Sequence, residues 1–265
     1  MNKVLVCYLF TDFDNTESIL NFKKNYKKYK SGLKHSLLIC FKLLEKKRIF
    51  LLKEKLKNLD YIEFIDPENS NDYDFGSYKR VAKKYPHHKI LFLNSHSYPI
   101  KKNWLKKLLL HFKKDTIIGT SASYESLLTS LNIKKIYKFF SFFYKFIKYK
   151  RRFKPFPNPH LRTSSFLIKG SDFNYFVKSR KFLNKEDAWL AESGFSSLTN
   201  FFKKKKFNIY VVNSDGFKFS ESNWKLSETY NYLDQSKSLI SDKHTRKYLK
   251  LSNKDRKKMS RISWG

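Results

Sequence analysis

Three polar residues after an apolar run have the clearest chemical potential in the sequence. Asn94, Ser95 and His96 directly follow residues 90–93, and apolar side chains at helical spacing come next, over residues 104–110. This order predicts a buried strand, a polar loop and a helix. Ligands of open α/β sheets bind beyond the carboxyl ends of strands, where backbone amides and helix N-termini converge. We therefore expect residues 94–96 to contact a ligand.

Acidic side chains in two other loops are candidates for contact with the same ligand. Asp12 follows the apolar run of residues 3–10, and Asp74 belongs to residues 66–76, which hold four carboxylates within a very basic chain. Carboxylates there can accept hydrogen bonds from a nucleoside base or from ribose hydroxyls. Asp74 has an alternative role as a helix cap, because it precedes the predicted helix 77–84.

Two later segments also carry titratable side chains. His160 and Arg162 follow three closely spaced prolines, and such a rigid loop suits a contact with phosphate or with an acceptor. The alternative is a rigid turn whose Arg162 pairs with the acidic loop. Asp187 and Glu192 lie around the start of a helix that we expect to continue to residue 206.

The apolar pattern of the chain as a whole predicts an α/β fold. Strands are expected at residues 3–10, 37–41, 61–65, 90–93, 116–126 and 209–212, with helices at 18–29, 42–58 and 77–84 between the first of them. Strands and helices that alternate in this way form a parallel sheet with right-handed crossovers. We expect one domain over residues 1–225, with residues 226–265 as a tail packed on it.

The composition restricts partners and compartment. The chain has 56 Lys and Arg against 23 Asp and Glu, and its net charge of +33 attracts polyanions such as nucleotide phosphates or an anionic membrane. An AT-biased genome would produce part of this excess by itself. Cys7 and Cys40 lie in apolar runs, which predicts buried thiols in a reducing compartment and no disulfide. Without a signal peptide or an apolar run of about 18 residues, the chain is predicted to be cytoplasmic.

Residues 134–154 interleave aromatic side chains with Lys and Arg. This pattern is typical of an amphipathic helix at a membrane interface, of a surface that stacks nucleic-acid bases, or of a core-packed helix with a basic face. Phe and Tyr lie on nearly every side of the predicted helix. We therefore include peripheral docking on the anionic inner face of a membrane among the expected interactions, whereas nucleic acid is not an expected partner.

The order of segments resembles the GT-A fold glycosyltransferases, in the large inverting, nucleotide-sugar-dependent family that builds surface polysaccharides. In that family a strand ends in an LD-x-D motif whose carboxylates bind a divalent metal and the donor diphosphate, and residues 92–99 (FLNSHSYP) stand in that place. Glu192-Ser193-Gly194 resembles the site of the family's acidic ED motif, the usual catalytic base. The resemblance covers roughly residues 3–215.

The resemblance implies a GT-A-like (Rossmann-like), mostly parallel central sheet flanked by helices. It implies Glu192 as the catalytic base, with Asp187 as second candidate, although Glu192 has the alternative role of a helix cap. The donor would then contact Asp12, Asp74, Asn94, Ser95 and His96, while His160 and Arg162 would contact the acceptor or a phosphate.

The sequence departs from the family's motif at the metal site. Asn94 and His96 replace both carboxylates, and neither an amide nor a neutral imidazole offsets the charge of Mg²⁺ or Mn²⁺ as Asp does. Three alternatives stay open: the diphosphate binds Lys and Arg without a metal, His96 ligates Mg or Mn weakly, or the protein is an inactive relative. No cofactor is firmly expected.

Motifs of several other enzyme classes are missing from the sequence. It has no G-x-x-x-x-G-K-[ST], G-x-G-x-x-G, H-E-x-x-H or G-x-S-x-G motif, which disfavours nucleotide kinases, zinc hydrolases and serine esterases. We expect a hexosyltransferase that moves a sugar from a nucleotide-sugar donor to a glycan or lipid-linked acceptor in cell-envelope polysaccharide biosynthesis. The alternative is a catalytically inactive protein of the same fold that binds polyanions or glycans.

Overall fold

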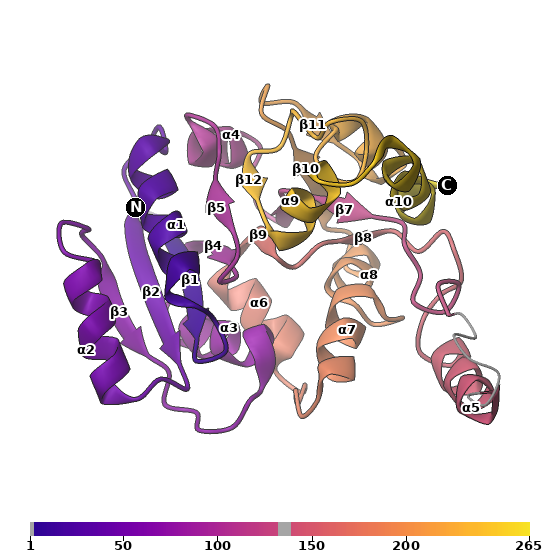
Figure 1. The fold of residues 1–265 in the computed structure, drawn as a ribbon, viewed down its shortest axis with the longest axis horizontal. Coiled ribbons are helices and arrows are strands. Elements are labelled where there is room, and N and C mark those ends of the chain that lie inside the picture. Colours follow the sequence, from indigo (N-terminus) through magenta and orange to yellow (C-terminus); the bar gives the residue numbers. More distant parts are fainter. Residues whose placement is uncertain (1–2, 132–138) are drawn as a thin grey trace.

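The computed structural model describes residues 3–131 and 139–265. Its centre is an eight-stranded sheet with the strand order β11-β10-β6-β9-β4-β1-β2-β3, and helices lie on both of its faces (Figure 1). The strands of this sheet are β1 (Val4–Thr11), β2 (Ser36–Lys42), β3 (Ile62–Ile65), β4 (Lys89–Leu93), β6 (Thr116–Gly119), β9 (Ser165–Lys169), β10 (Asn208–Val212) and β11 (Lys218–Phe219).

Two short strand pairs and the helices complete the described chain. The short strands are β5 (Tyr98–Pro99) with β12 (Ile240–Ser241), and β7 (Ala122–Ser123) with β8 (His160–Leu161). The helices are α1 (Thr16–Lys28), α2 (Lys46–Lys55), α3 (Tyr73–Lys84), α4 (Trp104–Leu110), α5 (Phe139–Lys150), α6 (Gly170–Val177), α7 (Lys185–Ser193), α8 (Leu198–Lys204), the 3-10 helix η2 (Glu221–Ser227), α9 (Lys243–Leu249) and α10 (Asn253–Trp264).

Most neighbouring strands of the large sheet are parallel. β1 is parallel to β2 and to β4, β2 is parallel to β3, and β6 is parallel to β10. β9 runs antiparallel between β4 and β6, and β11 is antiparallel to β10. The predicted α/β class, with a mostly parallel central sheet flanked by helices, is therefore confirmed.

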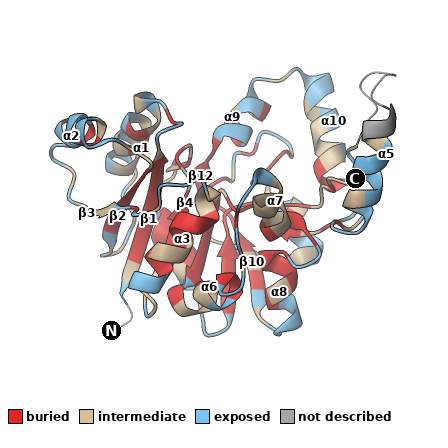
Figure 2. Cartoon of the chain, turned by 90° about the horizontal axis from the view of Figure 1, so that it is seen from below, coloured by how far each residue is buried: buried red, intermediate tan, exposed pale blue. Residues whose placement is uncertain are grey.

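The core lies on both faces of this sheet (Figure 2). Along β1, Leu5, Cys7 and Leu9 face one apolar cluster, while the residues between them face the other. This double burial explains why the strand is a nearly continuous apolar run. Cys7 and Cys40 are buried free thiols, as predicted, and burial raises the pKa of each well above its usual value.

Several element boundaries differ from the expected ones. The expected strand 116–126 is interrupted after β6, and β7 turns away to pair with β8. The predicted helix ending at residue 206 is two helices, because α7 ends at Ser193 and the chain breaks at Gly194 before α8. A Cβ at Gly194 would lie 2.7 Å from the carbonyl oxygen of Leu190, so this break requires glycine. Part of the segment 134–154 lies outside the described residues.

The segment after residue 226 returns to the large domain. β12 pairs with β5, which follows the central strand β4, and α9 begins directly after β12 (Figure 1). Trp264, at the end of α10, is buried, and its Nε1 donates to the carbonyl oxygen of Tyr230 (2.8 Å). Among the described helices, none is both long enough and apolar enough to cross a membrane.

Candidate active site at the carboxyl edge of the sheet

The strand order reverses direction between β1 and β4. From β1 the chain adds β2 and β3 on one side, and it then returns to place β4 on the other side. The loops that leave the carboxyl ends of β1 and β4 consequently diverge and leave a crevice, the usual ligand site of open α/β sheets. Asp14 lies in the first of these loops, and residues 94–97 form the second.

Asp14 joins the two loops. Its Oδ1 accepts a hydrogen bond from Ser95 Oγ (2.8 Å) and lies 3.5 Å from His96 Nε2, while its Oδ2 accepts from the backbone N of Thr11 (2.9 Å). The hydroxyl of Tyr8, within β1, donates to the carbonyl oxygen of Ser95 (2.6 Å). The predicted residues Ser95 and His96 therefore lie in the crevice, fixed by a carboxylate that the sequence did not single out.

Two other predicted donor contacts are placed differently. Asn94 Oδ1 accepts from Ser97 Oγ (2.7 Å) and from the backbone N of His96 (3.3 Å), so this amide braces its own loop. Asp12 forms an ion pair with Arg48, and its side chain remains 48% exposed. Of the two carboxylates in the first loop, Asp14 faces residues 94–97.

Cations from the C-terminal segment approach His96. A cavity of about 310 Å³ lies between the start of α1, the loop after β4 and α9, and Lys243 and Arg246 of α9 line it together with His96. Arg246 Nη1 donates to the carbonyl oxygen of His96 (3.0 Å), and its guanidinium lies 4.6 Å from the ring of Tyr98. Burial lowers the pKa of His96 despite the nearby Asp14, and Lys243 and Arg246 lower it further, so the imidazole is neutral at pH 7.

Asp74 adds another carboxylate to this edge of the sheet. Burial and the charges of Asp14 and Glu192 raise its pKa to about 6, against an opposing effect of Lys42. The prediction that Asp74 caps a helix from outside is wrong, because α3 already begins at Tyr73 with Asp72 as its N-cap residue. In the chain outside residues 1–2 and 132–138, no group of three His, Cys, Asp or Glu side chains is arranged to hold a metal ion.

Asp66 and Asp72 of the acidic loop form a partly buried ion-pair network. Asp72 is paired with Lys42 and Arg80, and Asp66 accepts from Arg80 Nε (2.5 Å). Burial alone would raise the pKa of Asp72, but the hydrogen bonds from Arg80 and Lys42 hold it below its usual value. Arg80 and Lys42, rather than Arg162, are therefore the partners of the acidic loop.

A second cavity contains the predicted catalytic and acceptor residues. It measures about 340 Å³ and lies between β7, β8, α7 and the C-terminal segment. Glu192 lines it from the last turn of α7, so the expectation that Glu192 starts or caps a helix is wrong. Its Oε1 accepts from the backbone N of Thr163 (3.2 Å). The lining also includes Glu125, His160, Arg162, Trp189, Tyr230 and His244.

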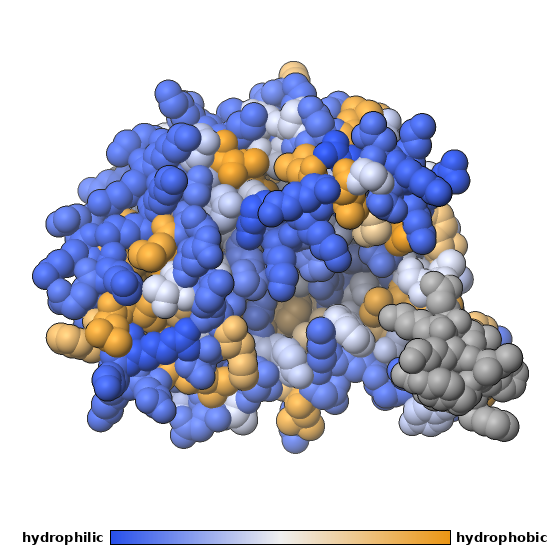
Figure 3. Space-filling view, in the orientation of Figure 1, coloured by the Kyte–Doolittle hydropathy of each residue, from blue (hydrophilic) through white to orange (hydrophobic). Residues whose placement is uncertain are grey.

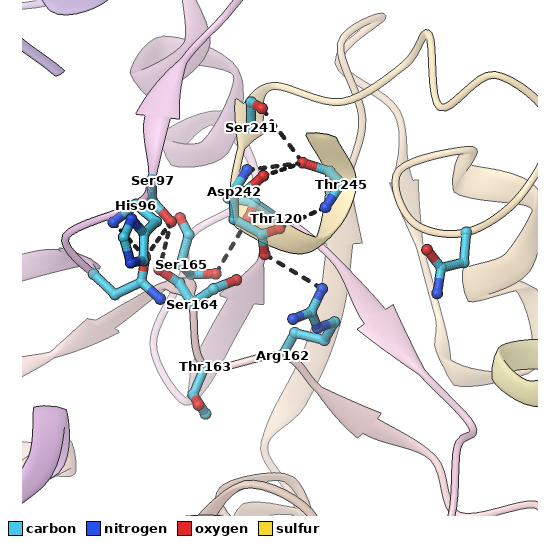
Figure 4. Close-up of polar contacts among 12 residues, drawn as sticks. His96, Ser97, Thr120, Arg162, Thr163, Ser164, Ser165, Ser241, Asp242 and Thr245 are labelled. Carbon is cyan, nitrogen blue, oxygen red and sulfur yellow. Dashed lines mark hydrogen bonds and ion pairs between the residues drawn. The ribbon is translucent and has the colours of Figure 1, made fainter. Parts of the chain in front are cut away.

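Arg162 connects this cavity to the C-terminal segment. Its Nη1 lies 3.3 Å from Oδ2 of Asp242, the N-cap residue of α9 (Figure 4). Its guanidinium lies 3.9 Å from the centre of the Tyr230 ring. Burial alone would lower the pKa of Arg162, but Tyr230 and Asp242 raise it, so the guanidinium stays charged. The predicted pairing of Arg162 with the acidic loop is therefore wrong, because Arg162 pairs with Asp242 instead.

His160 is buried beside Glu192. Its Nδ1 lies 2.8 Å from the carbonyl oxygen of Asn158, which fixes that nitrogen as the hydrogen-bond donor of the neutral ring. Burial lowers the pKa of His160 despite the nearby carboxylate of Glu192. The ring therefore lines the cavity in its neutral form at pH 7.

Asp187, the second candidate base, lies at the opposite end of α7 from Glu192. Its Oδ2 accepts from the backbone N of Leu183 (2.9 Å) and of Asn184 (3.1 Å), and Asn184 caps the helix in return. This is a capping box, which occupies the carboxylate. The structure thus brings His160, Arg162 and Glu192 together and places Asp187 apart from them.

Residues at this edge that sequence reasoning missed include Asp14, Glu125, Tyr230, His244 and Arg246. Asp14 shares an acidic loop with Asp12, and only the local hydrogen bonds distinguish the two carboxylates. Glu125 had a weak signal, because it ends a run of small hydroxyl residues. The others come from a segment without strong periodicity, and the pairing of β12 with β5 brings them to the site.

No family model and no curated protein matches the sequence. The fold is similar in part to that of a galactosyltransferase, LgtC, solved in complex with donor and acceptor sugar analogues (TM-score 0.45, 10% identity, 80% of this chain and 74% of that chain). It is also similar in part to 4-diphosphocytidyl-2C-methyl-D-erythritol synthase of Anaerococcus prevotii (TM-score 0.42, 12% identity, 82% of this chain and 90% of that chain). A third similar structure is the bifunctional glycosyltransferase WbbM (TM-score 0.42, 9% identity, 98% of this chain and 44% of that chain). Similarity at these levels carries no information about reaction or substrate.

Proposed function

We propose that the protein is a glycosyltransferase of GT-A-like fold that uses a nucleotide-sugar donor. The observation that carries the proposal is the composition of the carboxyl edge. Asp14, Ser95 and His96 meet at the strand-order reversal beside the cations of α9, and Glu192 faces a cavity on the same edge. Glycosyl transfer needs a place for a diphosphate and a carboxylate near an acceptor hydroxyl.

The donor would lie across the crevice between the loops after β1 and β4. Its diphosphate would bind Lys243 and Arg246, which line the cavity next to His96. Asp74, on the same edge, would accept hydrogen bonds from the nucleoside. We keep Ser95 and His96 as donor contacts, and we replace Asp12 by Asp14 because Asp12 is paired with Arg48.

The chemical step would be a displacement at the anomeric carbon of the donor sugar. Glu192 would take the proton of the acceptor hydroxyl as the new glycosidic bond forms, while the bond to the diphosphate breaks. The leaving diphosphate would keep the electron pair of that bond, and the cations of α9 would stabilise its charge. Arg162, charged and fixed by Asp242, would orient the acceptor or a phosphate oxygen.

The residues at the position of the family's metal motif do not fit Mg²⁺ or Mn²⁺. Asn94 Oδ1 is used within its own loop, and His96 offers a single imidazole where hard cations favour several oxygen ligands. We therefore propose that the transfer proceeds without a divalent metal, with Lys243 and Arg246 as the counter-charges.

This proposal predicts turnover that is insensitive to chelators. Purified protein given a panel of nucleotide sugars should release nucleoside diphosphate, and an excess of EDTA should change the rate by less than about twofold, because protein cations supply the charge. Loss of turnover in EDTA with rescue by Mn²⁺ would contradict metal independence. Absence of donor binding by calorimetry and of turnover across the whole panel would contradict the enzymatic proposal and favour the polyanion- or glycan-binding alternative.

We also propose that α5 attaches the protein peripherally to an anionic membrane, which suits a lipid-linked acceptor. Tyr144 and Ile147 of α5 are 69% and 49% exposed, on a helix that also carries Lys145 and Lys150. Exposed aromatic side chains among basic ones suit the headgroup region. α5 lies at one end of the molecule and is tied to α7 through Glu186, which pairs with Lys148 and Arg152 (Figure 1).

A further inference from the structure

We propose, on the basis of the proposed glycosyltransferase function, that the cavity between Glu125 and Glu192 binds the acceptor and selects a neutral or amino sugar over an acidic one. The cavity of about 340 Å³ is at the small end of ligand pockets, which is the size class of one short saccharide. The selection follows from which hydrogen-bonding groups and charges in the cavity remain without partners.

Two carboxylates supply unused hydrogen-bond acceptors in the cavity, and the buried Arg162 Nη1 makes no hydrogen bond with any described residue. The carboxylate of Glu125 accepts no hydrogen bond from any described residue, although the side chain is half-buried and lines the cavity. Burial raises its pKa, the charge of Arg162 opposes this effect, and the charge of Glu192 adds to it. Glu192 uses Oε1 for the backbone N of Thr163, which leaves Oε2 for a ligand. Groups of this kind need donors such as sugar hydroxyls or an ammonium.

The one cationic side chain among the lining residues that the structure describes is already balanced. Arg162 lies 3.3 Å from Asp242 and against the ring of Tyr230, and the lining His160 is neutral at pH 7. Glu125, Glu192 and Asp242 together outnumber Arg162, so the local charge is negative in a protein of net charge +33. A carboxylate on the ligand would meet two carboxylates, which is a selective penalty against acidic sugars.

The charge pattern also separates the acceptor from the donor. The other cavity of this edge, next to His96, is lined by Lys243 and Arg246 and suits phosphates. His244, between these two cations in α9, lines the acceptor cavity instead. The apolar face of the half-buried Trp189 gives the acceptor cavity a surface for the C–H face of a sugar ring. The two cavities therefore present opposite charge to an anionic donor and to an uncharged or cationic acceptor.

Saturation-transfer NMR with the full chain tests this inference directly. The probes are methyl glycosides of glucose and galactose, together with their 2-amino and uronic acid counterparts. The neutral and amino sugars should receive magnetisation by saturation transfer from the protein. The uronic acids should bind at least about fivefold more weakly because of like-charge repulsion. The inference is overturned if a uronic acid binds as tightly as its neutral partner, or if no neutral or amino sugar binds.

The variant Glu125→Gln tests whether the selection between sugars arises in this cavity, and Glu54→Gln is the control. Glu54 carries the same charge in an exposed ion pair of α2. Glu125→Gln should weaken binding of the amino sugars by about tenfold, since it removes one charged hydrogen-bond acceptor. It should also reduce the difference in affinity between the amino sugars and the uronic acids. Unchanged affinities would overturn the inference. Donor turnover, measured separately, reports on the glycosyltransferase proposal, because Glu125 lies outside the donor cavity.

Discussion

Buried carboxylates close together on the carboxyl edge of the sheet cost stability at neutral pH, and Asp74 is the clearest case. Burial, with the charges of Asp14 and Glu192, raises the pKa of Asp74 to about 6 from an ordinary value of 3.8. Between pH 4 and pH 6, the folded state therefore retains a proton that the unfolded state has lost. Stability contributed by this group is lost as the pH rises through that window.

Asp74→Asn should accordingly stabilise the protein at neutral pH. We expect a gain of about 2 kcal/mol in the free energy of unfolding at pH 7 and little gain at pH 4, because Asp74 is protonated there in the folded state. Urea unfolding of the parent and the variant at pH 4 and pH 7 measures the gain at each pH. A similar gain in the free energy of unfolding at both pH values, or a loss at pH 7, would contradict the environment described for Asp74. If Asp74 contacts the nucleoside, the same variant should bind the donor more weakly.

At the scale of single residues, the sequence singled out positions where a residue type and its neighbours were both unusual. His160 and Arg162 follow rigid prolines, and the structure places them with Glu192 in one cavity, while their predicted roles stay predictions. Asp14 was passed over for Asp12, because two carboxylates two positions apart differ only in which backbone and side-chain donors surround them. Those donors, such as Ser95 Oγ, come from a distant part of the chain.

At the scale of elements, the start of α3 links the acidic loop to the sheet. Asp72 precedes the helix, and Lys42 and Arg80 hold its carboxylate in place. Gly76 lies one turn later, and a Cβ there would overlap the carboxylate of Asp72. Glycine within this helix is thus required by the ion-pair network around Asp72.

Gly76→Ala should destabilise the protein although alanine favours helices. The gain in helix propensity of about 1 kcal/mol should be outweighed by displacement of the paired Asp72, for a net loss of about 2 kcal/mol. Thermal unfolding of Gly76→Ala and of the same change in an Asp72→Ala background measures the coupling. The change should become neutral or stabilising in that background. An equal loss in both backgrounds would show that the overlap with Asp72 is not the cause.

Helix α5 gives a second prediction at this scale. Lys148 and Arg152 pair with Glu186, so Lys145, Lys150 and Arg151 are the charges to test for membrane contact. Replacing these three by Gln should weaken sedimentation with anionic liposomes, by roughly 1 kcal/mol per charge. The matched control replaces Lys46, Lys47 and Lys55 of α2, at the other end of the molecule (Figure 1). Equal losses for both variants would indicate nonspecific attraction by net charge, and unchanged sedimentation would exclude docking through α5.

The strands were the most predictable elements. Their apolar runs are long because both faces of the sheet are covered, and β1, β2, β3, β4 and β10 lie within a residue or two of the expected positions. The break at Gly194 was missed, since the apolar spacing continues from α7 into α8. Helices α9 and α10 were missed as well, because α10 buries little more than Ser263 and Trp264 and shows only a weak apolar stripe.

At the scale of the whole molecule, the site depends on chain segments that are far apart in the sequence. The loops after β1 and β4 meet because of the strand order, and β12 then brings α9 against them. Sequence patterns predicted the sheet and the loops at its carboxyl edge. They did not predict the return of the C-terminal segment, whose two-residue strand and short helix carry too little periodicity to be recognised.

The distribution of charge is also visible only at this scale. Hydrophilic side chains cover most of the face seen in Figure 3 and leave scattered hydrophobic groups. A net charge of +33 would by itself suggest polyanion binding everywhere on such a surface. The structure instead places carboxylates together at the carboxyl edge, beside cations that come from α9. This separation of charge fits the proposed transfer from an anionic donor to a hydroxyl acceptor.

The central claim is that Glu192 removes the proton of the acceptor hydroxyl. Asp187 provides a matched control, because it is a carboxylate on the same helix that is occupied by capping. The decisive measurement is the turnover of a nucleotide sugar by Glu192→Gln beside Asp187→Asn, with donor affinity measured for each by calorimetry.

Glu192→Gln should lose about 10²–10⁴ in turnover while it keeps its donor affinity, since a general base acts on the reaction rather than on donor binding. Asp187→Asn should keep turnover within a few-fold of the parent and lose about 1 kcal/mol of stability through its weakened cap. A Glu192→Gln protein with near-parental turnover, or an Asp187→Asn protein that alone is inactive, would contradict the assignment of the active site.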